Sequence, residues 1–336
     1  MRSRPVILVH HATAAAAIVA LVAAGCGRMS LVLPVRLEHE TISAPLRPGP
    51  ITGCESAGRV IAAIIVTELA LPLPQQFTAF VYPSRAAYEQ GLVRMAGIQP
   101  VRAAEIADYS VGLGHHRQLF INDEALRGAP RTDWLGVVAH ELAHAAQYEL
   151  SGGRRGKSEQ WLREGMADWV RFLVLERLEE KTFRHQRERA LSAVARALPA
   201  LQDDPPDLLV LGSPPGWSAR TARSGDRLTY GLAFLLTDDL IRHRGLESLR
   251  AYFRAFAHSD DRFGHFRRAF GRSLAEFQSE ALDRIRTELE RAQGQKGGES
   301  VSLADARPEA RVFDWEAQAA GIWIEKGPTS APFTSR

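Results

Sequence analysis

A helical stretch at residues 137–148 constrains the fold of this chain more than any other feature. It reads VVAHELAHAAQY, with His140 and His144 four residues apart and Glu141 next to the first histidine. Four residues make slightly more than one helical turn, so both imidazoles project from one face and can bind the same metal ion. Glu141 then points toward a water in the open position of the metal, from which it can take a proton. The pattern therefore predicts a hydrolytic centre on one helix.

A catalytic zinc ion usually has three protein ligands and a water, so this helix lacks one ligand. Glu164 lies 20 residues after His144, near the start of a second amphipathic segment, which leaves room for a loop and an antiparallel helix. Asp168 lies one turn further along the same face, where it can accept the free N–H of a ligating histidine and fix its tautomer. We expect His140, His144 and Glu164 to bind one zinc ion per chain.

The order HExxH followed by ExxxD resembles the motif of the gluzincins, the thermolysin-like branch of the zinc metallopeptidases. The resemblance implies that Glu141 is the general base and later the proton donor, and that Asp168 supports a ligating histidine. The metzincin pattern does not fit, because Gln147 and Leu150 stand where that family has glycine and a third histidine. A solvated polar helix face is the non-functional alternative for the same residues.

The resemblance is strict over about residues 134–170 and looser over 230–280, which is similar to the C-terminal helices of bacterial peptidase-MA-like proteins. It implies an α+β, zincin-like domain over residues 55–292. A small N-terminal lobe, about 55–153, would place a short mixed sheet over the zinc helix. A helical C-terminal lobe, about 154–292, would form the other side of the cleft.

Local patterns predict the remaining elements. A strand is expected at 77–82, and a hairpin across 109–122 would supply the sheet edge to which, by the resemblance, an extended peptide adds. Thr132 or Asp133 is expected to cap the zinc helix, and residues 151–153 to end it. Residues 203–225, rich in proline, glycine and serine, predict a long connection of the kind that forms lids or substrate loops. The other expected helices are 56–71, one capped by Ser84, one from 161 to 178, 191–201, 226–243, 247–257, 261–270 and one from Ser273 to about 291.

Hydrolysis at zinc produces an oxyanion that needs a hydrogen-bond donor besides the metal. Gluzincins commonly use a tyrosine or histidine of the C-terminal lobe, so Tyr230 is our candidate, and Tyr148, one turn after His144, is the second choice. His115 and His116 lie in the expected hairpin turn, where a histidine is more often solvated than bound to metal.

Residues 1–26 predict a signal peptide, because Arg2 and Arg4 precede an apolar run of 13 residues that is too short to span a bilayer comfortably. The small residues before Cys26 resemble a bacterial lipoprotein signal, which implies that Cys26 is lipidated. An uncleaved anchor helix is the alternative. If Cys26 carries no lipid, a disulfide with Cys54 is possible. We expect a tether at 27–54 and a polar, partly mobile tail at 293–336.

The net charge of +3 does not indicate a nucleic-acid partner, because 38 of the 42 basic residues are arginines spread among acids. The sequence predicts zinc-dependent hydrolysis of peptides or proteins in the cell envelope, periplasmic or at the cell surface. One alternative is a non-catalytic envelope lipoprotein that binds a peptide or partner on the same scaffold. Hydrolysis of a non-peptide substrate is another, and the oligomeric state is left open.

Overall fold

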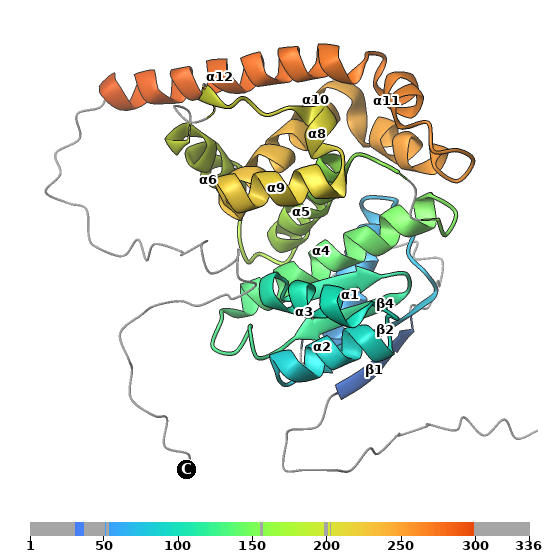
Figure 1. The fold of residues 1–336 in the computed structure, drawn as a ribbon. Helices are drawn as coiled ribbons and strands as arrows, with labels where there is room; N and C mark the ends of the chain where they lie inside the picture. Colours follow the sequence, from blue (N-terminus) through green and yellow to red (C-terminus); the bar gives the residue numbers. More distant parts are fainter. Residues whose placement is uncertain are drawn as a thin grey trace, which may run out of the picture.

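The computed structural model describes residues 31–36, 51, 54–154, 157–197, 201 and 203–298. These residues form a mixed α+β structure that is mostly helical, as predicted. Figure 1 shows helix α4 (Arg131–Leu150) between a small lobe, which holds the sheet, and a larger helical lobe. The predicted signal peptide, with Cys26, lies outside the described residues. Within the described ranges, no helix is long and apolar enough to cross a membrane.

The small lobe contains a four-stranded mixed sheet with strand order β1-β2-β4-β3. β2 pairs parallel with β4, and β1 and β3 pair antiparallel with β2 and β4 respectively, so β3 is an edge strand. The tether prediction is wrong for residues 31–36: LVLPVR is rich in strand formers, and an edge strand tolerates its proline. The strands are β1 (Leu31–Arg36), β2 (Gln76–Tyr82), β3 (Gly112–His115) and β4 (Gln118–Asn122).

Alternate residues of β2 face opposite sides of the sheet, as the period of a strand requires. Phe77 and Val81 belong to the large core, which α4 shares, whereas Phe80 and Tyr82 pack in a separate cluster with α2 and α3. The sheet is therefore buried on both faces, and its strand β3 packs against α4. The helices of this lobe are α1 (Cys54–Thr67), α2 (Arg85–Arg94) and α3 (Pro100–Tyr109).

The predicted cap of α2 is confirmed, because the Ala87 N–H donates to the Ser84 hydroxyl. α1 ends earlier than predicted, at Thr67, and Ala70 then adopts a left-handed φ of 47°. α3 is not predicted from the sequence. Cys54, at the start of α1, is half-buried and forms no disulfide with another described residue, and burial raises the pKa of its thiol.

α4 begins at Arg131 after Pro130, which makes no side-chain cap. The prediction that Thr132 or Asp133 caps the helix is wrong, because both lie inside its first turn. The Thr132 hydroxyl instead donates to Glu180 at 2.7 Å. The predicted end is confirmed: Ser151 follows the helix, and Gly152 takes a φ of 65° that favours glycine.

In the described residues of the large lobe, all regular secondary structure is helical. The long connection predicted at 203–225 is wrong, because two helices begin there behind local caps, Asp207 and Ser213, and bury Leu208 and Trp217. α12 runs to Gly298, so the predicted tail is helical as far as that residue. The helices are α5 (Gln160–Arg177), α6 (Phe183–Arg196), α8 (Leu208–Leu211), α9 (Pro214–Ser224), α10 (Asp226–Ala255, interrupted at Gly245), α11 (Arg262–Phe270) and α12 (Leu274–Gly298).

α5 is the central helix of the large lobe, with Trp161, Met166 and Val170 fully buried. Gly165 lets α10 approach closely, because a Cβ at this position would lie 2.3 Å from the Ala233 carbonyl oxygen. This approach brings the first turns of α10 beside the Glu164 end of α5. The close contact at Gly165 thereby sets the position of α10 relative to Glu164.

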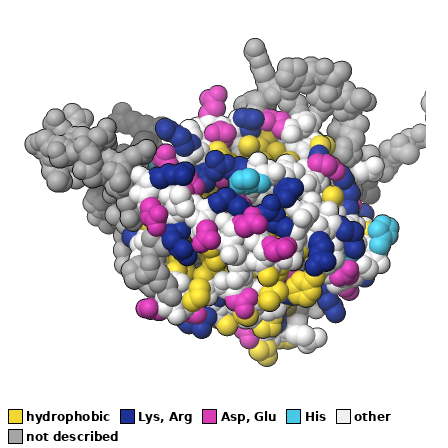
Figure 2. All heavy atoms as spheres, turned by 90° about the horizontal axis from the view of Figure 1, so that it is seen from above, with side chains coloured by type: hydrophobic (Ala, Val, Ile, Leu, Met, Phe, Trp, Pro, Cys, Tyr) yellow, Lys and Arg dark blue, Asp and Glu magenta, His cyan; other side chains and the backbone are white. Residues whose placement is uncertain are grey.

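The outer face of the large lobe carries intermixed charges (Figure 2). Arg187 of α6 illustrates the pattern, since it pairs with Asp238 of α10 and with Glu288 of α12. Arg284 of α12 pairs in turn with Asp239 of α10 at 2.7 Å. On this face the arginines link helices to one another, as expected of basic residues spread among acids.

Glu159, directly before α5, is a buried carboxyl with a shifted pKa. It is 0% exposed, and burial outweighs the charge of Arg262, 3.0 Å away, so its pKa is raised to about 7. Below the unfolded pKa, near 4.5, the carboxyl is protonated in both the folded and the unfolded state, and its contribution to stability is fully present. Between pH 4.5 and 7 the unfolded chain loses this proton more readily than the folded one, so the contribution is lost as the pH rises through 7.

We therefore expect Glu159→Gln, which stays neutral, to gain stability relative to wild type as the pH rises. Between pH 4.5 and pH 8 the difference in free energy of unfolding should change by about 3 kcal/mol, from the factor of 1.36 kcal/mol per pKa unit. Urea unfolding at several pH values measures it. Parallel pH profiles for the two proteins would contradict the assignment.

Candidate metal centre

The predicted ligand residues come together where α4 meets α5. His140 Nε2 lies 3.2 Å from His144 Nε2 and 3.3 Å from Glu164 Oε2, and the distance from His144 Nε2 to Glu164 Oε2 is 3.5 Å. Ligand atoms about 2.0–2.1 Å from a tetrahedral metal are about 3.3 Å apart. The three residues are therefore placed to hold a metal ion, and in the described part of the chain they are the group with this property.

Neighbouring side chains orient both imidazoles. His140 Nδ1 donates to Asp168 Oδ1 at 3.0 Å, as the sequence predicts. His144 Nδ1 donates to Gln147 Oε1 at 3.1 Å, and the Gln147 amide is itself fixed because its Nε2 donates to the Arg163 carbonyl at 2.8 Å. Both hydrogen bonds place a proton on Nδ1, so Nε2 is the atom of each neutral ring that is left to bind a metal ion.

The role of Gln147 is not predicted from the sequence, where this residue stands out only as a departure from the metzincin pattern. A signal for it exists, because a residue three positions after His144 on a helix lies on the same face. Gln160, one turn before Glu164, is a second neighbour that the sequence does not predict, and its Nε2 donates to Glu164 Oε1 at 2.8 Å. Gln147 and Gln160, in addition to Asp168, therefore orient the candidate ligands by hydrogen bonds.

The charges at this site favour a cation. Burial alone would raise the pKa of Glu164, but His144 and His140 outweigh it and hold that pKa well below its usual range. Burial would lower the pKa of His140, but hydrogen bonds to Asp168 and Glu164 outweigh it and raise the pKa to about 10. The carboxylate is thus ionised as a ligand must be, and a bound metal ion would displace the proton of His140.

Glu141 lies beside the triad but does not belong to it. It projects toward the small lobe, where the Gly114 N–H of edge strand β3 donates to Glu141 Oε2 at 2.5 Å. Glycines permit this close approach: a Cβ at Gly114 would lie 2.8 Å from the Glu141 carbonyl oxygen, and one at Gly112 would lie 2.7 Å from Val137 Cγ1. The sheet edge thus holds the carboxylate next to the metal-binding face.

Two tyrosines interact with residues of the triad. Tyr230 of α10 has its ring 6.4 Å from the ring of His140, and it stacks edge-on against Trp217 of α9. Burial and the nearby carboxylates raise its pKa well above 10, so its hydroxyl remains a donor. Tyr109 of α3, which is not predicted, interacts electrostatically with Glu164, and its hydroxyl accepts a hydrogen bond from Arg102 at 2.9 Å.

The remaining candidates lie around the end of β3. Tyr148 packs its ring 4.8 Å from that of His116 and lies beside Gly153, so it contacts the turn between β3 and β4 and the turn after α4. His116 occupies the turn between β3 and β4 with a φ of 56°, and its ring lies 4.1 Å from that of His115. Neither histidine belongs to the candidate group formed by His140, His144 and Glu164.

Residues 115–194 match a family model described as "Peptidase of plants and bacteria". The matched segment includes α4 and α5, and therefore all three candidate ligands, Glu141 and Asp168. It supports a protease. Neither the comparison with curated proteins nor the comparison with solved structures gave a match.

Gln147→Met provides a test of the orientation of His144. Methionine has a similar length, but its thioether is only a weak acceptor for the imidazole N–H, so we expect metal affinity to fall about 10–100-fold, the usual cost of losing such a partner. A chelator competition measures the affinity, and circular dichroism confirms that the fold is kept. Unchanged affinity in a folded variant would show that Gln147 only packs there.

Proposed function

We propose that this chain is a zinc-dependent peptidase of the gluzincin type. The observation that carries the proposal is the arrangement of His140, His144 and Glu164, with their ligand atoms within 4.8 Å of one another and Glu141 held beside them but outside the set. Three nitrogen and oxygen ligands with a separate carboxylate are typical of catalytic rather than structural zinc. The peptidase family model over the same residues supports the same interpretation.

Zinc, when bound by these residues, would polarise a carbonyl and lower the pKa of water to about 7. Glu141 would take the proton of the attacking water as its oxygen bonds to the scissile carbon. The carbon–nitrogen bond then breaks, and Glu141 delivers the proton to the leaving amine. The hydroxyl of Tyr230 would donate to the oxygen on which negative charge develops.

Edge strand β3 is our candidate for the binding of an extended peptide. It pairs with β4 on one side only, and its Gly114 N–H already points toward Glu141. A substrate that added to this edge as another strand would lie along the metal-binding face of α4. We place the activity in the cell envelope, with an anchor at Cys26, on the basis of the N-terminal sequence.

The test is the cleavage of a mixed peptide library by the purified protein, together with its metal content by mass spectrometry. We expect about one zinc per chain, cleavage that a chelator abolishes, and recovery on addition of zinc. Stoichiometric zinc without cleavage would instead favour the alternative of a non-catalytic scaffold or a non-peptide substrate. Absence of bound metal would refute the proposal.

A further inference from the structure

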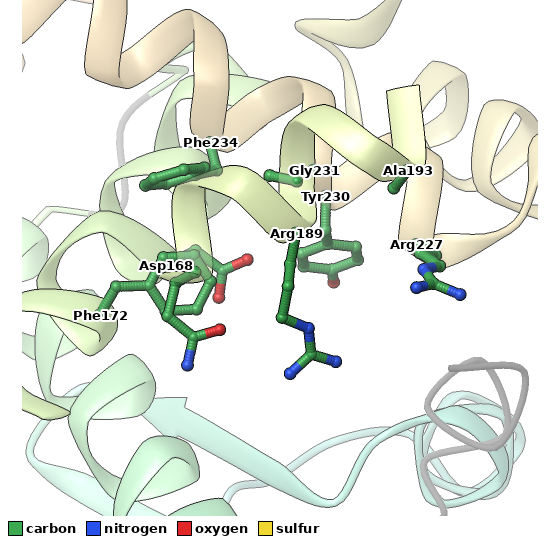
Figure 3. Close-up of a pocket in the computed structure, with 10 residues that line it drawn as sticks. Asp168, Phe172, Arg189, Ala193, Arg227, Tyr230, Gly231 and Phe234 are labelled. Atoms are coloured by element: carbon green, nitrogen blue, oxygen red, sulfur yellow. The ribbon is translucent and has the colours of Figure 1, made fainter. Parts of the chain in front are cut away.

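A cavity lies between α5, α6 and α10, directly beside the candidate metal centre. It shares Asp168 and Tyr230 with that centre and offers about 20 Å³ to the centres of water-sized groups, which is enough for a small terminal group of a ligand. In Figure 3 the guanidinium groups of Arg189 and Arg227 and the hydroxyl of Tyr230 extend to the same side of the cavity. A group bound there would be adjacent to the hydroxyl that we assign to oxyanion stabilisation.

The cavity has an apolar side and a basic side. Phe172 and Phe234 pack edge to face with ring centroids 4.8 Å apart, and alanines of α6 continue this wall. Arg189 and Arg227 provide the basic side. The complementary ligand has a short apolar portion that ends in an anion, since the guanidinium fork suits a carboxylate.

The charges of Arg189 and Arg227 repel each other on the basic side. Burial lowers the pKa of Arg189, and the charges of Arg227 and Arg171 lower it further, while Asp133 acts in the opposite direction. Asp168 lies 3.5 Å from Arg171 and also accepts from His140, so it is already engaged. An anion between the guanidiniums of α6 and α10 would relieve their mutual repulsion.

Asp226 is a further acid that opposes this attraction. Asp226 lies in the first turn of α10 and interacts electrostatically with Tyr230. Burial raises its pKa to about 6, so near neutral pH it adds up to one negative charge. The cavity lining itself carries two guanidiniums, those of Arg189 and Arg227, and one carboxyl, that of Asp168.

We propose that Arg189 and Arg227 form a subsite that binds a carboxylate of the peptide substrate. The carboxylate would belong either to a glutamate or aspartate side chain or to the C-terminus, because both offer the same anion on a short carbon stem. This inference rests on the proposed peptidase function and adds a substrate class to it.

The test compares matched peptides on the full-length, zinc-loaded protein. The peptides of one pair are amidated at the C-terminus and differ only by Glu or Gln at a single position, and this position is moved along the peptide from one pair to the next. The other pair has a free or an amidated C-terminus and no acidic side chain. We measure kcat/KM, and we measure peptide affinity by fluorescence anisotropy on the Glu141→Gln protein, where cleavage does not interfere.

We expect one of the carboxylate peptides to exceed its neutral partner about 10–100-fold in both measurements, the scale of hydrogen bonds to a charged group. In the double variant Arg189→Gln/Arg227→Gln that ratio should fall to about one. Arg184→Gln, a change on the same helix at a side chain that is 88% exposed, is the control and should keep the ratio. The pair that shows the preference identifies the source of the carboxylate.

Two results would overturn the inference in different ways. If neutral peptides are cleaved and no carboxylate preference exists, or the double variant keeps it, the subsite is wrong and the peptidase function stands. If no peptide is bound or cleaved, the proposed function fails and the subsite fails with it.

Discussion

Glu141→Gln should bind zinc as wild type does and lose about 10²–10⁴-fold in kcat, the range attributed to a positioned general base. Glutamine matches glutamate in size, and its side-chain oxygen can still accept the Gly114 N–H that holds residue 141 against β3. It cannot take a proton from water. Because Glu141 lies outside the triad, the ligand set is left intact. Metal content and single-turnover cleavage measure the two effects separately.

Glu141→Asp is the matched control, since it keeps the base and withdraws it by one methylene. We expect activity between those of wild type and the glutamine variant. Full activity in Glu141→Gln would assign the base elsewhere. Loss of metal in that variant would mean that Glu141 contributes to the metal site itself.

The candidate metal centre is predictable from sequence because its geometry is local. His140 and His144 share a helix, so their separation is set by the helical period rather than by the fold. Asp168 follows Glu164 by the same period on α5, and its hydrogen bond to His140 is present as predicted. Only the packing of α4 against α5 depends on tertiary structure. Gly165, a small residue next to Glu164, lets α10 pack closely against α5 at this point.

Features that depend on distant segments were not predictable in the same way. Trp217 packs against Tyr230 from α9, in a stretch whose proline and glycine content predicts a loop. Ser213 and Pro214 start that helix by capping, a signal of a few residues that composition hides. Arg189 and Arg227 lie on different helices, so nothing in their spacing indicates a shared cavity.

The edge strands show the same limit. β3 approaches α4 because Gly112 and Gly114 present no Cβ to Val137 and Glu141, whereas two glycines in a hairpin sequence indicate only a turn. β1 joins the sheet from residues 31–36, where a proline argues against a strand except at an edge. Whether a strand lies at an edge depends on which other strands pair with it, and this is a property of the whole sheet.

Glu164→Ala should abolish stable metal binding, because it removes one of three protein ligands and the only anionic one in the triad. Zinc affinities of about 10–16 kcal/mol for four-ligand sites imply roughly 3–4 kcal/mol per ligand, or about a 10²–10³-fold weaker Kd. A protein in zinc at 100 times its Kd gains about 2.7 kcal/mol of stability from the metal. At the same zinc concentration the variant should show almost none of this gain.

Thermal unfolding with and without zinc, beside a chelator competition, measures both quantities. Glu188→Ala, at an exposed side chain on α6, is the control and should keep the zinc-dependent rise in Tm. The unfolding of metal-free Glu164→Ala shows whether the fold itself is kept, so a lost rise cannot be confused with a lost structure. A variant that still bound zinc with wild-type affinity would mean that two histidines and solvent suffice, and the third ligand would have to be sought elsewhere around the cleft.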